Sequence, residues 1–174
     1  MARKHARLMV SVWDDKDFTS RTSVEQNVFF ALISSRDLSW CGVAPYLPKR
    51  LIRNASDLTE RKVVAAIERL RATRFVVVDD STDEILVRRF VHYDEVMKQP
   101  NVAKGMASAT KRVHSQHLSA VILDELAREM TEQPDFKGWA SLRASFPELF
   151  EQVCAKASGK GFGNPSVTPL AKGA

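Results

Sequence analysis

The chain has 174 residues, 44% of them apolar, which is enough for one ordinary globular domain with an appendage and a hydrophobic core. A formal net charge of +5 favours a polyanion or an anionic surface as partner, because net charge bears on association rather than on fold. Two distant cysteines exclude a disulfide framework, and the lack of a signal sequence or a membrane-length apolar run predicts a soluble, cytoplasmic protein with no membrane partner.

The N-terminal part predicts an extended segment, a helix and a second extended segment. Apolar residues alternate with others over residues 8–13, which is the period of a short strand or extended arm. Thr22 and Glu25 have the spacing of a capping box, and the apolar stripe after them predicts a helix over residues 22–34. A brief extended segment is expected at residues 41–43.

Two further helices are expected next. Pro48 suits a first helical turn and predicts a short helix over residues 47–54. Thr59 is the predicted N-cap of a third helix, which should pack on the core through one apolar stripe. That stripe consists of Val63, Ile67 and Leu70.

Two β-rich runs, residues 75–78 and 85–90, flank a polar turn and predict a hairpin. The expected fold class is therefore mostly α with a small β-hairpin (α+β). Three helices followed by a hairpin is the order of a winged helix-turn-helix, in which the third helix enters the major groove of DNA. Residues 1–98 are predicted to form this DNA-binding domain.

The rest of the chain is predicted to be a helical extension, residues 99–157, and a flexible tail, residues 158–174. Gln99-Pro100 interrupts any helix, after which apolar residues recur with a helical period, and a last helix is expected with Pro147 in its first turn. The tail is rich in Gly, Pro and Ser and has no periodicity. The residues that could pack either on their own domain or on a second subunit, as in a homodimer, are Val102, Met106, Leu118, Ile122 and Leu126.

The outer face of the third helix is basic and contains small residues. At about 100° per residue, Arg61, Ala65 and Glu68 lie opposite the apolar stripe, and Lys62 and Arg69 flank them. Small side chains let a helix approach the groove, and arginine or lysine can reach phosphates or the acceptors of guanine. Glu68 suits a cytosine amino group or a neighbouring arginine.

Positive charge is concentrated around this helix. Residues 47–74 contain eight lysines and arginines against three acidic residues, a balance of +5, as expected of a phosphate-binding surface. The alternative is a solvated helical face without a partner. The predicted DNA-binding residues are Lys49, Arg50, Arg53, Thr59, Arg61, Lys62, Ala65 and Arg69.

The predicted hairpin tip is acidic, and phosphates would repel it. We therefore expect the tip to stay out of the minor groove, which leaves it open to a protein partner. Arg88 and Arg89 follow on the returning strand, where alternation should turn one of them outward to contact the DNA backbone. The acidic residues are Asp79, Asp80, Asp83 and Glu84.

Four runs within residues 8–113 are G-V-A-P-Y-L-P-K-R-L-I-R-N-A-S-D-L-T-E-R-K-V-V-A-A-I-E-R-L, F-V-V-V-D-D, E-I-L-V-R-R-F-V-H-Y-D-E-V and P-N-V-A-K-G-M. Together they resemble phage replication initiators, or replisome organisers, whose N-terminal domain is a winged helix. The resemblance implies origin DNA binding and recruitment of the host replicative helicase or its loader, in the host cytoplasm if the chain is phage-encoded. Ser56-Asp57 departs from relatives, which commonly have a Gly there. The matching recognition-helix positions are Thr59, Arg61, Lys62, Ala65 and Arg69.

Signals for an enzyme fail one by one. The alternating glycines of residues 159–163 lack the strand and helix of a phosphate loop, and His114 and His117, expected on one helix face, lack further metal ligands. We predict no catalytic residue, no cofactor and no metal site. The leading function is sequence-specific binding of double-stranded DNA by a phage-type replication initiator. The alternatives are a transcriptional regulator with the same winged helix and a protein-interaction module that binds no DNA.

Overall fold

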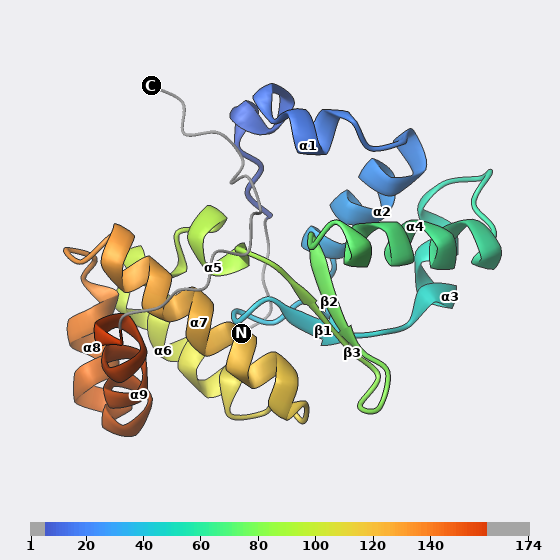
Figure 1. Cartoon of the computed structure of the whole chain (residues 1–174). Coiled ribbons are helices and arrows are strands. Elements are labelled where there is room, and N and C mark those ends of the chain that lie inside the picture. Colours follow the sequence, from blue (N-terminus) through green and yellow to red (C-terminus); the bar gives the residue numbers. More distant parts are fainter. Residues whose placement is uncertain (1–5, 160–174) are drawn as a thin grey trace.

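The computed structural model describes residues 6–159, so residues 160–174 of the predicted tail lie outside the described residues. Helices dominate this part of the chain, and three short strands form one antiparallel sheet (Figure 1). The predicted fold class, mostly α with a small amount of β structure, is confirmed. Among the helices of this range, none has both the length and the apolar character that crossing a membrane needs.

The N-terminal segment is helical rather than extended. The 3-10 turn η1 (Val10–Asp14) leads into the short helix α1 (Lys16–Thr19), so the short strand or extended arm expected over residues 8–13 is wrong from residue 10 onward. Asp15 caps α1, because its carboxylate accepts bonds from two amides of the first turn at 2.7 and 3.2 Å. Of the alternating apolar residues only Val12 is buried, and a single anchor does not require a pleated strand.

Helix α2 (Ser23–Ile33) lies where the sequence predicts it. Thr22 is its N-cap, with Oγ1 accepting a bond from the amide three residues on at 3.3 Å. On the buried side, Phe29 packs edge-on against Phe18 and Phe75, with ring centroids 5.6 and 5.7 Å apart. Helix α2 also packs along the third predicted helix and therefore supports that helix on its buried side.

The second and third predicted helices are confirmed. Helix α3 (Pro48–Leu51) continues into the 3-10 turn η2 (Ile52–Asn54), and α4 (Glu60–Ala72) follows after a short connection. Thr59 caps α4, since its hydroxyl oxygen accepts a bond from the amide of Lys62 at 3.3 Å. The buried stripe of α4, each member 0% exposed, consists of Val63, Ile67 and Leu70.

The sheet contains the predicted hairpin and one strand from earlier in the chain. Strands β1 (Val43–Pro45), β2 (Val76–Asp79) and β3 (Glu84–Val87) are antiparallel in the order β1-β3-β2, so β3 is central. Gly42 turns the chain into β1 with a φ of +83°, and a Cβ there would lie 2.9 Å from Cβ of Phe90. Only glycine fits this close approach without strain.

The expected helical extension is present but is divided more finely than predicted. The turn at residues 111–115 breaks the helical period expected after Pro100, and the helix at residues 138–145 was not predicted. Pro147 begins the last helix, as expected. The elements are α5 (Phe90–Tyr93), η3 (Val96–Lys98), α6 (Pro100–Thr110), α7 (Gln116–Glu132), α8 (Gly138–Ser145) and α9 (Pro147–Ser158).

The apolar residues considered for a dimer pack inside their own chain. They belong to one continuous core that also contains the residues of the sheet and of α4. Val102 is partly buried in this core. The residues that are at most 1% exposed are Met106, Leu118, Ile122 and Leu126.

Candidate nucleic-acid interface

All eight predicted DNA-binding residues lie on one unit formed by α3, η2 and α4, and all eight are exposed. In Figure 1 this unit occupies the end of the molecule opposite α8 and α9. The packing of α4 on α2 explains the exposure of the residues on α4, because the buried stripe turns the remaining side chains of α4 toward solvent. The structure therefore brings the predicted residues together on one surface.

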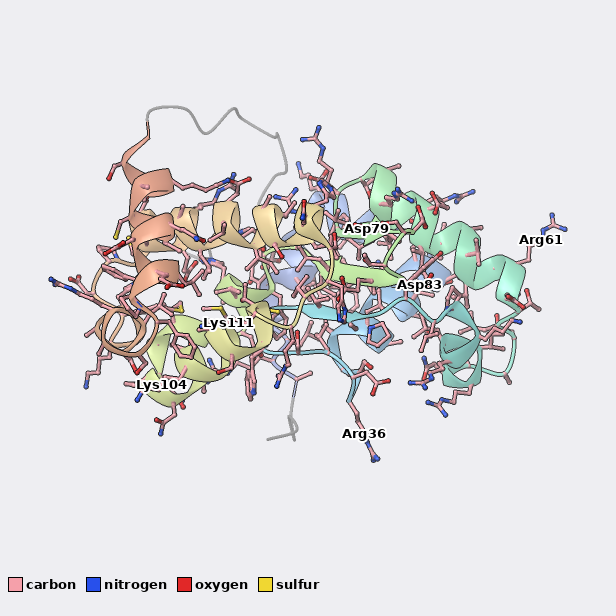
Figure 2. All side chains as sticks on the ribbon, turned by 90° about the horizontal axis from the view of Figure 1, so that it is seen from below. Arg36, Arg61, Asp79, Asp83, Lys104 and Lys111 are labelled. Atoms are coloured by element: carbon pink, nitrogen blue, oxygen red, sulfur yellow. The ribbon has the colours of Figure 1, made fainter. Side chains whose placement is uncertain are left out.

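Arg53 and Arg61 are unpaired within this surface. In residues 6–159 neither has an ion-pair partner. Arg61 projects into solvent from the N-terminal end of α4 (Figure 2). A guanidinium without a competing carboxylate can bind a phosphate or the edge of guanine without breaking an existing bond.

Val64 belongs to the same face, although sequence reasoning did not assign it. Its side chain is 36% exposed, and it lies three residues after Arg61 and four before Glu68. Next to exposed Ala65, it gives the outer face an apolar centre that suits the methyl group of thymine. The helical spacing contained this signal, because Val64 is not part of the predicted stripe of Val63, Ile67 and Leu70.

The other four predicted cations are in ion pairs within the chain, and three of these pairs are exposed at both ends. Exposed pairs contribute about 0–1 kcal/mol each, so a phosphate can replace the carboxylate at little cost. These three cations therefore remain able to bind a polyanion. The pairs are Lys49 with Glu60 at 4.0 Å, Arg50 with Asp37 at 2.8 Å and Lys62 with Asp57 at 3.6 Å.

Arg69 is held more firmly. Its Nη1 lies 3.1 Å from Oε1 of Glu25 on α2, and the Glu25 side chain is only 4% exposed. Moving Arg69 toward DNA would leave a buried carboxylate unpaired, which costs more than breaking an exposed pair. This geometry makes Arg69 an anchor of α4 on α2 and opposes the base-reading role expected for it.

The expectation that Arg88 or Arg89 faces outward to contact DNA is wrong. Strand β3 ends at Val87, and the two arginine side chains are 14% and 9% exposed. Arg88 Nε lies 2.9 Å from Glu125, and Arg89 Nη2 lies 2.8 Å from Glu132, both on α7. Burial raises the pKa of Glu125, although hydrogen bonds from Arg88 and from the Arg89 amide oppose that rise.

The acidic hairpin tip binds its own chain. Glu84 accepts bonds from the two amides that precede α7, at 3.1 and 2.8 Å, and Asp79 accepts one from the Ser115 hydroxyl. Carboxylates at this position also stabilise the positive N-terminal end of α7. Asp80 pairs with Arg71 of α4 at 3.0 Å. Three of the four tip carboxylates are therefore bonded within the chain, and one of them, Asp80, is paired with an arginine.

His92, Glu129 and Glu132 are a group, within the part of the chain described, whose ligand atoms lie within 4.8 Å of one another. His92 Nδ1 lies 2.7 Å from Oε2 of Glu129, while Arg89 binds the Glu132 carboxylate. A guanidinium on one of the three ligands would repel a metal ion. The group therefore joins α5 to α7 through the His92–Glu129 hydrogen bond and the Arg89–Glu132 ion pair.

His114 and His117 do not share a helix face, so that expectation is wrong. Helix α7 begins only at Gln116, because Ser115 is its N-cap and accepts a bond from the amide of Leu118 at 2.9 Å. His114 lies before the helix, with Nδ1 3.6 Å from Glu84.

The surface with the features of a binding site is therefore the α3–α4 unit, with Arg53 and Arg61 free to bind. Comparison of the chain with family models, with curated proteins and with solved structures found no match.

Proposed function

We propose that the protein binds duplex DNA by inserting α4 into the major groove, in the manner of a winged helix-turn-helix. In this arrangement α3 and α4 form the helix-turn-helix, and β2 with β3 forms the wing. The order of elements and the central position of β3 support the assignment. The observation that carries the proposal is the outer face of α4, where unpaired Arg61 lies beside exposed Val64 and Ala65.

Each residue type on this face suits one part of the duplex. Arg61 would bind guanine O6 and N7, and Val64 and Ala65 would contact thymine methyl groups. Glu68 would accept a bond from a cytosine amino group. Arg53 and the exchangeable cations of α3 would bind phosphates, which fix the position of the helix but read no sequence.

The role that we propose for this binding is replication initiation in the host cytoplasm, as the resemblance to phage initiators implies. The helical extension would then contact the host helicase or its loader. A transcriptional regulator would need the same groove-reading residues, so the target sequence separates the two roles. Direct repeats at an origin would support initiation, and a site overlapping a promoter would support regulation.

The proposal is tested by selecting bound duplexes from a random pool with the full chain, and measuring their affinity against scrambled controls across a salt series. We expect a recurrent motif that binds about 10³-fold or more tighter than the controls. Absence of binding even at low salt would overturn the proposal and favour the protein-interaction module.

A further inference from the structure

A second basic surface lies outside the α3–α4 unit. Residues 96–123 contain no aspartate or glutamate, although four lysines and arginines fall within them. Lys104 and Lys111 are seven residues apart, so they lie on one side of the helical stretch that ends in the turn after α6. Both are exposed, and within residues 6–159 neither has an ion-pair partner. Lys111 Nζ lies over the Phe146 ring, 5.2 Å from its centroid.

The loop before β1 connects this side of α6 to α3. Trp40 lies directly on α6, because a Cβ at Gly105 would be only 3.2 Å from Cδ1 of that indole. In the same loop, Asp37 binds Arg50 of α3 at 2.8 Å. Arg36, the residue before Asp37, is exposed, and the described ion pairs do not include it. Exposed cations therefore continue from α3 across this loop to α6.

In Figure 2 the three cations lie lower in the view than Asp79 and Asp83 of the hairpin. Arg36 projects from the lower edge and Lys104 lies at the lower left, with Lys111 farther from that edge. The acidic residue nearest to Arg36 in sequence, Asp37, is neutralised by its arginine partner. Asp83 lines one pocket with Arg112, the residue after Lys111, so this end of the surface also carries a carboxylate.

We propose that Arg36, Lys104 and Lys111 form a basic strip that binds the sugar-phosphate backbone of duplex DNA beyond the segment contacted by α4. This inference rests on the proposed function. The cations are spread over a loop and a helix and do not converge on one point, an arrangement that does not suit a small anion. A linear polyanion with a charge about every 1.7 Å of its axis suits such a spread. Single lysines on phosphates give affinity without base reading.

The test compares two duplexes that share the selected motif, one of about one helical turn and one of about three turns. We expect the triple variant R36Q/K104Q/K111Q to bind the short duplex like the unmodified protein. On the long duplex the affinity of the variant should be about tenfold lower or more. The slope of log K against log salt concentration should decrease in magnitude by about 2.7 units, or 0.9 for each phosphate contact. The matched control is Lys16→Gln, at an exposed position on α1, which should leave the affinity for both duplexes unchanged.

The possible outcomes separate the strip from α4. Equal salt slopes for the variant and the unmodified protein on the long duplex would show that the strip does not bind DNA, and would leave binding by α4 intact. An equal loss on the short and long duplexes would also overturn the proposed strip, because the three residues would then act within the α4 contact. No binding of the unmodified protein to either duplex would remove both proposals. Thermal unfolding of the variant checks that its fold is unchanged.

Discussion

The arginines of α4 and those that follow β3 have the same charge in opposite surroundings. Arg61 extends into solvent at the end of the molecule, and the described residues provide it with no carboxylate. Arg88 and Arg89 have side chains 14% and 9% exposed and bind Glu125 and Glu132 of α7. Sequence reasoning treated both groups as possible DNA contacts, but only the first is positioned to make one.

This difference shows that partner and burial decide what a cation does, whereas its position along the chain does not. A solvated arginine without a partner keeps its charge for an incoming phosphate. A buried arginine has lost its water and needs its carboxylate, so its pair holds two parts of the fold together. Variants of the two groups should therefore affect different properties, folding stability for one and DNA affinity for the other.

The largest effect is expected from Glu125→Ala. This change removes the carboxylate that binds both Arg88 Nε and the amide of Arg89, each at 2.9 Å, and leaves the Arg88 guanidinium, in a side chain only 14% exposed, unpaired. The free energy of unfolding should fall by about 3–5 kcal/mol, as urea titration followed by circular dichroism would measure. Glu151→Ala on α9, an exposed position, should change it by no more than about 0.5 kcal/mol. Equal small losses in both variants would show that the buried network does not support the fold.

Arg69→Ala should also act on stability, by a smaller amount. It leaves the Glu25 carboxylate, in a side chain 4% exposed, without its partner at 3.1 Å. The free energy of unfolding should therefore fall by about 1–3 kcal/mol. The motif chosen from a random pool should stay the same. A changed motif with unchanged stability would show that Arg69 reads bases after all.

Arg61→Ala should show the converse pattern. We expect no change in stability, because the residue is exposed and unpaired among the described residues, but a loss of about 1–3 kcal/mol in binding to the selected motif if Arg61 reads guanine. Lys49→Ala is the comparison within the same surface. It should weaken binding to all sequences alike and lower the salt slope by about one unit. Loss of affinity for motif and scrambled duplexes alike in Arg61→Ala would reduce that residue to a phosphate contact.

Much of the fold could be predicted because local chemistry determined it. Thr22, Thr59 and Pro147 each mark the start of a helix in the sequence and do so in the structure. The segment at residues 8–13 was predicted wrongly, because alternation over so few residues does not distinguish a strand from a turn with one buried valine. Helix α8 is short and begins at a glycine, and neither feature signals a helix.

The candidate site was predictable in its location and less so in its chemistry. Helical spacing alone places Arg61, Ala65 and Glu68 on one face, and the structure has all three exposed. That Arg69 binds Glu25 depends on a residue 44 positions away, and such a contact exists only after α2 and α4 pack together. The acidic hairpin tip was left open to a partner protein, because no pattern in the sequence shows that α7 begins beside it.

The smallest effect concerns the contact between the hairpin and α7. Hydrogen bonds from Ser115 and Ser81 lower the pKa of Asp79 from 3.8 to about 2. Because the folded pKa is depressed, the stability that Asp79 contributes is complete above pH 3.8 and is lost as the pH falls toward 2. The difference in Tm between the unmodified protein and Asp79→Asn should therefore be constant near neutral pH and shrink over this acidic range. The control is Asp135→Asn, at an exposed position before α8, whose Tm difference from the unmodified protein should not shrink over this range. A Tm difference for Asp79→Asn that does not depend on pH would mean that the Asp79 charge does not hold the hairpin on α7.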